Sequence, residues 1–255
     1  MKTTVPTSFP LIVEHECDAV RYNWTAPPLH RGEIHVWRQK HDVASTVLEA
    51  FNKLLSDEER DRARRFRFDE GRNEYIASRG TLRVLLGAYQ RTAADQLQFA
   101  YTEFGRPVLA DASQYEPIEF NLSHSGGLTL LAFARHHRIG IDVEEVRTTF
   151  DPTEIAENYF SQAERRILRT LPPKLRHEAF FRCWTRKEAF IKALGDGLSH
   201  SLDAFDVSLS PGDPTALLAT RPDAREAECW ALRDIEVPEG YLAALAVKLE
   251  LQTER

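Results

Sequence analysis

Apolar and polar positions follow two different periods along the chain, and each period predicts one kind of element. Alternation with a period of two predicts strands at residues 34–37, 97–102 and 139–143. Apolar residues at i, i+3, i+4 and i+7 predict a helix over residues 73–90. The run 128–134, apolar at nearly every position, predicts a buried central strand. We therefore expect both helices and strands.

Two Ser-x-x-Glu sequences have the spacing of a capping box, in which the serine hydroxyl and the glutamate carboxylate satisfy free N–H groups where a helix begins. Ser56 and Glu59 predict a helix over residues 57–66. Ser161 and Glu164 predict a second helix further along the chain. Each of these helices follows a predicted strand, so the chain shows signs of repeating one order of elements.

The order of predicted elements is the same in the two halves: a strand, then helices, then three strands. We therefore predict an α+β fold of two pseudo-symmetric lobes, a single-chain pseudo-dimer. The first lobe covers residues 1–137 and begins with an extended lead-in, residues 1–32, that lies on the body of the protein; the second covers residues 138–255. Because pockets favour such interfaces, we expect the active site between the lobes. The other elements predicted are a strand at 119–123, a long helix at 175–194, and strands at 205–209, 229–236 and 241–249.

Composition narrows the class of protein. The chain has 255 residues, of which 42% are hydrophobic and 28% charged, as in a folded soluble domain. Its 39 acidic and 33 basic residues give a net charge of −6, which argues against binding nucleic acid or an anionic membrane through overall charge. No apolar run approaches the roughly 20 residues of a membrane span. Three cysteines without a C-x-x-C pair and an N-terminus without a secretory signal predict a cytoplasmic protein with reduced thiols.

The sequence 139–144, Ile-Gly-Ile-Asp-Val-Glu, places Asp142 and Glu144 on one face of a predicted strand. Two carboxylates this close are costly unless a cation lies between them, and Mg²⁺ prefers hard oxygen ligands of this kind. Asp142 and Glu144 are therefore candidate metal ligands. The alternative is an amphipathic edge strand whose polar side faces solvent.

A second group of charges lies on the predicted long helix. Glu188 and Lys192 are four residues apart and share a face, with Lys187 one position around the helix. An exposed Glu–Lys pair is the alternative interpretation. Trp184 and Ile191 make the helix apolar around much of its circumference, so these charges should border its buried side.

Residues 120–127, Phe-Asn-Leu-Ser-His-Ser-Gly-Gly, leave a strand in a turn rich in hydroxyl groups. Small residues with exposed N–H groups suit a phosphate, and His124 can add charge or a hydrogen bond. An ordinary hairpin turn is the alternative. Ser123 and His124 are adjacent in a strand and point to opposite faces, so no catalytic triad is predicted.

Arginines are concentrated between Arg60 and Arg83. On a helix Arg60 and Arg64 cannot face the same way as Arg62. Most of these arginines should therefore be solvated or paired with the acidic residues at 57–61, and we expect one or two of them to reach a ligand.

Taken together, four motifs resemble the series found in the 4′-phosphopantetheinyl transferases. Their order and spacing are similar to the larger, monomeric, two-lobed type named after the surfactin-synthetase activator. The resemblance covers about residues 56–205. The motifs are Phe104-Gly105-Arg106-Pro107, Asn121-Leu122-Ser123-His124-Ser125-Gly126, Gly140-Ile141-Asp142-Val143-Glu144 and Trp184-x-x-Lys187-Glu188-Ala189-x-x-Lys192.

The resemblance implies transfer of the phosphopantetheine arm of coenzyme A to a serine of an apo acyl or peptidyl carrier protein, with release of adenosine 3′,5′-bisphosphate. It implies Mg²⁺ as the metal, with Mn²⁺ as the alternative, and a monomeric enzyme. Glu188 would remove the proton of the serine, directly or through a metal-bound water, and Lys192 would offset charge on the leaving group. Gly105-Arg106-Pro107 departs from the commoner Gly-Lys-Pro, and Glu145 follows the two presumed ligands.

The resemblance also assigns site residues. The metal ligands would be Asp142, Glu144 and Glu188. The residues that contact coenzyme A would be Arg62, Thr102, Gly105, Arg106, Asn121, Ser123, His124, Asp142, Lys187 and Lys192.

Two other functions use the same residues. A Mg²⁺-dependent phosphohydrolase of nucleotides or coenzyme A would take water as the acceptor. An inactive protein that binds coenzyme A or a carrier is the third hypothesis, against which the intact Asp142, Glu188 and Lys192 argue.

Overall fold

Helices and strands follow one another in blocks, and the same order of blocks occurs twice. The computed structural model describes residues 5–6, 9–17, 26–110, 117–195 and 200–252. The helices are α1 (Ser45–Leu54), α2 (Asp57–Arg64), α3 (Asp69–Gln90), α4 (Pro152–Tyr159), α5 (Gln162–Thr170) and α6 (Pro173–Leu194). The strands are β1 (Val5–Pro6), β2 (Leu11–Glu16), β3 (Glu33–Lys40), β4 (Phe99–Tyr101), β5 (Pro107–Leu109), β6 (Ile118–Ser125), β7 (Leu128–Arg135), β8 (Ile139–Glu145), β9 (Phe205–Val207), β10 (Leu217–Thr220), β11 (Trp230–Asp234), β12 (Tyr241–Lys248) and β13 (Leu251–Gln252).

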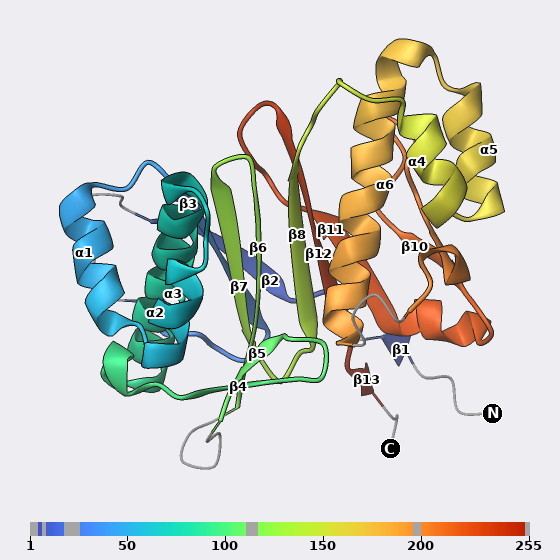
Figure 1. The fold of residues 1–255 in the computed structure, drawn as a ribbon. Coiled ribbons are helices and arrows are strands. Elements are labelled where there is room, and N and C mark those ends of the chain that lie inside the picture. Colours follow the sequence, from blue (N-terminus) through green and yellow to red (C-terminus); the bar gives the residue numbers. More distant parts are fainter. Residues whose placement is uncertain (1–4, 7–8, 18–25, 111–116, 196–199, 253–255) are drawn as a thin grey trace.

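Two main sheets carry the fold. The first has the strand order β2-β3-β7-β6, with β2 parallel to β3 and the other pairs antiparallel. The second is antiparallel with the order β11-β12-β8. Two-stranded ribbons, β4–β5 and β9–β10, flank them, and β1 pairs with β13, so both ends of the described chain lie on one side in Figure 1.

The two halves have the same topology. In the first, β3 is followed by α1 to α3, the ribbon β4–β5 and the hairpin β6–β7, whose second strand pairs with β3. In the second, β8 is followed by α4 to α6, the ribbon β9–β10 and β11–β12, whose second strand pairs with β8. The long helices α3 and α6 each have 22 residues. This arrangement confirms the predicted α+β fold with two similar parts.

Alternation of side chains along the strands creates three apolar layers. One face of β8, with Ile139, Ile141 and Val143, packs with residues of both sheets in a shared core. The opposite face of the first sheet packs on α3, and that of the second sheet packs on α6. In Figure 1 the helices α1 to α3 and α4 to α6 accordingly lie at opposite sides of the strands. Asp142 and Glu144 therefore belong to the face of β8 that is turned toward α6.

Both predicted capping boxes are present, with the serine hydroxyl and the glutamate carboxylate each bonded to backbone N–H groups. The helix α1 was not predicted from the sequence, because its first turn follows Ala44, which provides no side-chain cap. Where it is described, the extended lead-in 1–32 contains a strand that the sequence did not predict: β2 pairs with β3 at the edge of the first sheet. Residues 1–4, 7–8 and 18–25 of that lead-in lie outside the described residues.

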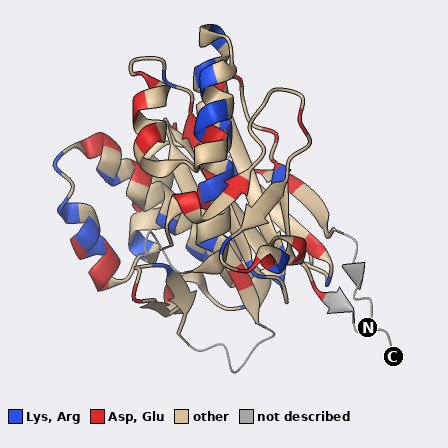
Figure 2. Ribbon diagram, turned by 90° about the vertical axis from the view of Figure 1, so that its right-hand side faces the viewer, with Lys and Arg blue, Asp and Glu red and all other residues tan. Residues whose placement is uncertain are grey.

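Charged side chains of both signs occur together on the helices, as the similar numbers of acidic and basic residues in the sequence suggest. In Figure 2, Lys and Arg residues are interspersed with Asp and Glu residues along the helices on the side of the molecule that faces the viewer. Among the described residues, no helix is both long enough and apolar enough to cross a membrane.

Candidate active site

A cavity of about 570 Å³ opens between the two halves of the molecule. Its walls come from α2, α3, the β4–β5 ribbon and β6 on one side and from α6 on the other. The lining residues are Arg62, Tyr75, Ser78, Arg79, Tyr101, Phe104, Gly105, Arg106, Pro107, Phe120, Asn121, Leu122, His124, Glu188, Ile191, Lys192 and Gly195.

Beside the cavity, polar side chains join β6 to β8, the facing edge strands of the two sheets. Alternate residues of β6 point toward β8 because side chains in a strand alternate between faces. These residues therefore connect the two sheets, and the intervening His124 is left to face the cavity. The contacts are Asn121 Oδ1 accepting from the Ile141 N–H (2.9 Å), Ser123 Oγ donating to Asp142 Oδ1 (2.8 Å) and Ser125 Oγ donating to Glu144 Oε2 (2.8 Å).

The carboxylates of Asp142, Glu144 and Glu188 and the ammonium group of Lys192 influence one another's charge where β6 and β8 approach α6. Lys192 Nζ donates to Asp142 Oδ1 at 2.6 Å and to Ser123 Oγ at 2.8 Å. Burial, and then the charge of Asp142, raise the pKa of Glu144 above its ordinary value. The same two causes raise the pKa of Glu188, although Lys192 opposes them. The cluster therefore carries more negative charge than Lys192 compensates.

This excess charge is the property of a cation site. Asp142 is 2% exposed, and its Oδ2 has no hydrogen-bond partner among the described residues. A buried carboxylate oxygen without a partner, next to two carboxylates of raised pKa, fits a hard divalent cation. Across the described parts of the chain, no three His, Cys, Asp or Glu side chains are arranged to enclose a metal ion. Lys192 and Ser125 instead occupy one oxygen each of Asp142 and Glu144.

Lys187 does not belong to this cluster, which corrects the role that the motif implied for it. Its side chain is fully buried, and Nζ lies 2.8 Å from Glu164 Oε2. The same ammonium donates to the carbonyls of Leu202 (2.7 Å) and Phe205 (2.6 Å). With its hydrogen-bonding capacity used inside the second half of the molecule, Lys187 is not in a position to meet a ligand in the cavity.

The first half repeats the arrangement around Lys187. Arg83 and Lys187 each lie 14 positions after the first residue of their long helices. Arg83 Nε donates to Glu59 Oε2 at 2.7 Å, and Glu59, like Glu164, is the buried glutamate of a capping box. Arg83 also donates to two carbonyls before β4, those of Ala94 and Leu97. Arg83 and Lys187 therefore have the same structural role: each connects a capping box and a long helix with the segment that leads into the next ribbon.

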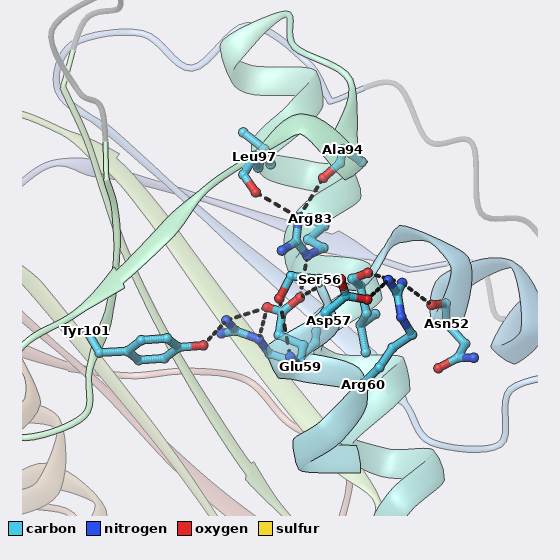
Figure 3. A network of polar contacts seen from close by, with 11 residues as sticks. Asn52, Ser56, Asp57, Glu59, Arg60, Arg83, Ala94, Leu97 and Tyr101 are labelled. Carbon is cyan, nitrogen blue, oxygen red and sulfur yellow. Dashed lines mark hydrogen bonds and ion pairs between the residues drawn. The ribbon is translucent and has the colours of Figure 1, made fainter. Parts of the chain in front are cut away.

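Glu59 also supports the wall of the cavity, and Figure 3 shows the polar contacts that run from Glu59 to Tyr101. Arg79 donates from Nε to Glu59 Oε1 at 2.9 Å and from Nη2 to the Tyr101 hydroxyl at 3.0 Å. Burial alone would raise the pKa of Glu59, but Arg79, Arg83 and the Ser56 N–H together lower it below its ordinary value. One carboxylate thus faces two guanidinium groups, and surplus positive charge lies behind Tyr101.

The other predicted residues are placed differently from one another. Arg62, Gly105 and His124 line the cavity. Thr102 does not: it closes the β4–β5 turn, where its Oγ1 accepts from the Arg106 N–H at 3.2 Å. The Arg106 guanidinium lines the cavity and also joins the two halves, since it donates to Glu119 (2.9 Å) and to the carbonyls of Phe120 (3.0 Å) and Lys192 (3.4 Å).

Sequence reasoning missed several residues of the wall. Tyr75, Ser78, Tyr101 and Phe104 line the cavity, and Arg79 does so with its side chain held by Glu59. The capping-box glutamate was the available signal for Arg79, because a cap carboxylate that is also buried needs a cationic partner. The expected surface pairs do occur between Arg60 and Asp57 and, as a short contact, between Arg64 and Asp61.

Comparison with known proteins decides the family. Residues 138–246 match the model described as the 4′-phosphopantetheinyl transferase superfamily, and residues 39–136 match the model for the N-terminal part of 4′-phosphopantetheinyl transferases. A 4′-phosphopantetheinyl transferase of Nostoc sp., HetI, is 37% identical over 232 residues, which are 89% of this chain and 94% of the relative. The chain belongs to the 4′-phosphopantetheinyl transferase superfamily. This confirms the resemblance seen in the four motifs.

Other relatives of the transferase carry the same activity in their names. Sfp of Bacillus subtilis, a 4′-phosphopantetheinyl transferase, is 30% identical over 77% of this chain and 84% of its own length. The human L-aminoadipate-semialdehyde dehydrogenase-phosphopantetheinyl transferase is 27% identical over 77% of this chain and 68% of its own length. Among solved structures, the ACPS–CoA complex from Chronobacterium ammoniagenes aligns with 48% of this chain and all of its own, at 21% identity and a TM-score of 0.34.

The transferase is thus an enzyme that transfers the 4′-phosphopantetheinyl group. Neither the phosphohydrolase nor the inactive binding protein, the two alternatives that the residues left open, is supported by these relatives.

Proposed function

We propose that the transferase moves the phosphopantetheine arm of coenzyme A to a serine of an apo acyl or peptidyl carrier protein, using a Mg²⁺ site next to the cavity. The observation that carries the proposal is the cluster of Asp142, Glu144, Glu188 and Lys192. It combines a cation site, a candidate base and a fixed ammonium group, and two of its members, Glu188 and Lys192, line a ligand-sized cavity.

The lining of the cavity supports a place for coenzyme A. Arg62 and the Arg79 guanidinium give one end positive charge, as a phosphorylated nucleotide requires. Gly105 and Arg106 form the ribbon turn along which the adenosine end would lie. His124 faces the cavity and would meet the 3′-phosphate, while Lys192 would neutralise the diphosphate. Asn121 and Ser123 support this site through their contacts with β8. Thr102 and Lys187 have no ligand contact in this proposal.

Asp142, Glu144 and Glu188 would hold the metal. Mg²⁺ is the ion that this oxygen-only donor set favours, with Mn²⁺ as the alternative. When bound, the ion would neutralise charge on the diphosphate oxygens. It would also lower the cost of keeping three carboxylates ionised together, which the raised pKa values of Glu144 and Glu188 reflect.

Within this site the transferase acts mainly by positioning and electrostatics. Glu188 takes the proton of the carrier serine. The serine oxygen forms a bond to the phosphorus that carries the pantetheine arm. The bond between that phosphorus and the bridging oxygen breaks, and adenosine 3′,5′-bisphosphate leaves. Lys192 stays beside the leaving oxygen and offsets its charge, and Asp142 keeps the ammonium in place through the 2.6 Å contact.

The carrier we propose is an acidic domain, which a basic and apolar rim around the cavity mouth would attract. Exposed Phe104 and Tyr101 beside Arg62 provide such a rim. We also propose that the transferase is monomeric, cytoplasmic and independent of nucleic acid. The three cysteines are free, which suits a reducing compartment.

Release of adenosine 3′,5′-bisphosphate from coenzyme A, with and without an apo carrier, tests the proposed acceptor. A transferase releases one nucleotide for each carrier serine and none without a carrier. Release that continues without a carrier would identify water as the acceptor and contradict the proposal.

A further inference from the structure

A histidine outside the cavity lies directly behind its wall. His41 follows the last residue of β3, and its backbone N–H donates to the Gly127 carbonyl at 2.9 Å in the β6–β7 turn. Its side chain is only 8% exposed. The imidazole is therefore fixed between the end of one strand and the turn of the hairpin that carries His124.

The His41 ring has a polar partner on each side. Nε2 lies 2.6 Å from Thr129 Oγ1, a hydrogen bond. On the other side, Nδ1 lies 3.0 Å from Glu74 Oε1, an ion-pair contact without the alignment of a hydrogen bond. The two contacts involve both ring nitrogens and together fix the orientation of the ring.

His41 is connected to the cavity through Thr129 and through the neighbouring ring of His124. Thr129 on β7 stands directly opposite His124 on β6, and side chains opposite one another on a ladder point to the same face. Thr129 Oγ1 also lies 2.9 Å from the hydroxyl of Ser78, which lines the cavity. The rings of His41 and His124 are 6.5 Å apart between centroids and tilted by 55°.

We propose that His41, held by Glu74, is a positioning residue that turns His124 toward the 3′-phosphate and makes the transferase select coenzyme A over 3′-dephospho-coenzyme A. The inference rests on the proposed function, since His124 is there assigned to the 3′-phosphate. His41 itself is not among the lining residues and touches no ligand. Its effect should therefore appear only when the ligand carries the group that His124 meets.

Binding of the two ligands, measured by calorimetry without a carrier, tests the inference. In H41Q the Kd of coenzyme A should rise about tenfold, the order expected for coupling between neighbouring side chains, while the Kd of 3′-dephospho-coenzyme A stays the same. E74Q, which keeps the imidazole, should shift the ratio of the two Kd values in the same direction. In an H124Q background the H41Q substitution should have no further effect on that ratio.

The matched control is H30Q, because His30 is an exposed histidine that is not among the lining residues. It should leave both Kd values unchanged. An equal loss of affinity for both ligands in H41Q would mean a purely structural role and would overturn the proposal, as would an unchanged ratio. If H41Q does not fold, E74Q decides on the same criterion. Because binding is measured apart from transfer, wild-type protein that binds coenzyme A but modifies no carrier would contradict the proposed function and leave this test intact.

Discussion

Lys187 and Glu188, which are adjacent on α6, lie in different environments. Lys187 is buried and paired with Glu164, whereas Glu188 faces the cavity. Neighbours on a helix are separated by about 100°, so one of them can face the interior and the next a cavity. The motif identified both residues, but their roles depended on which side of α6 meets β9. That information lies in the packing and not in the sequence of the helix.

The raised pKa of Glu188 gives a prediction about E188Q. Burial and Asp142 raise the pKa of Glu188 in the folded state, so the ionised carboxylate destabilises the fold. The free energy of unfolding therefore falls as the pH rises from the ordinary pKa of a glutamate through the raised pKa of Glu188. In EDTA at about pH 7.5, E188Q should melt about 2–4 °C higher for each kcal/mol removed. At about pH 3, well below the ordinary pKa, Glu188 is protonated in both states, and the two proteins should melt alike. Transfer should fall about 10²-fold or more.

E178Q is the matched control on the same helix, because Glu178 is an exposed residue that pairs with Arg182 away from the cavity. It should keep its transfer rate and show no gain in melting temperature. Wild-type transfer by E188Q would remove Glu188 from its proposed role as the base.

The metal site gives a second prediction at the neighbouring carboxylate. D142N keeps the shape of the side chain but removes one negative charge from the cluster and from the Lys192 contact. The Mg²⁺ concentration for half-maximal transfer should rise at least about tenfold, as for loss of a charged ligand. The measurement is a Mg²⁺ titration of carrier modification. An unchanged titration would place the metal elsewhere.

The active residues depend on how closely α6 approaches β8. Gly140 is the point of contact: a Cβ there would lie 2.1 Å from the Ala189 carbonyl oxygen and 2.3 Å from the Ala193 nitrogen. These are backbone atoms of α6, so the helix itself would have to move. Glu188 and Lys192 would then shift relative to Asp142 on β8.

G140A should therefore lower both stability and transfer. Overpacking of this kind costs about 1–3 kcal/mol, and a displacement near 1 Å can reduce a reaction rate about 10²-fold. Urea unfolding and the carrier assay measure the two effects. G71A on α3 is the control, since its new Cβ would meet only the half-exposed ring of Phe66 at 3.2 Å, and it should leave transfer unchanged. A fully active G140A would show that the distance between α6 and β8 is not critical.

The buried pair on α6 gives a prediction about K187M. Removal of the ammonium leaves Glu164 buried without its cation, which costs about 3–5 kcal/mol. The double variant K187M/E164Q should recover part of that loss, as measured by urea unfolding. The protein that remains folded should bind coenzyme A with wild-type affinity. Weaker binding without a loss of stability would restore Lys187 to the ligand site.

Elements were predictable where a local signal specified them. Both capping boxes marked helices correctly, and the alternation in residues 139–143 identified β8. The short strands β5 and β10 were missed, because three or four residues carry too little periodicity. The contacts of Asn121 and Ser123 with β8 were not predicted for another reason: they depend on β8 lying beside β6, and these strands belong to two separate sheets.

The two halves of the transferase share a scaffold but not a chemistry. In each half a buried capping-box glutamate binds a basic residue of the long helix, Glu59 with Arg83 and Glu164 with Lys187. Only α6 adds Glu188 and Lys192, and only β8 adds Asp142; Val84 and Ala88 occupy the positions on α3 that correspond to the first two. The repeat explains the fold, and the departures from it mark the site.

The most direct test of the whole account is the intact mass of several apo carrier proteins after incubation with the transferase, coenzyme A and Mg²⁺. A matched incubation contains EDTA. We expect a gain of one phosphopantetheine on at least one carrier, absent in EDTA and absent when the carrier serine is replaced by alanine. If coenzyme A is consumed but no carrier gains mass, the proposed reaction is contradicted. A gain that EDTA does not affect would contradict the proposed metal site.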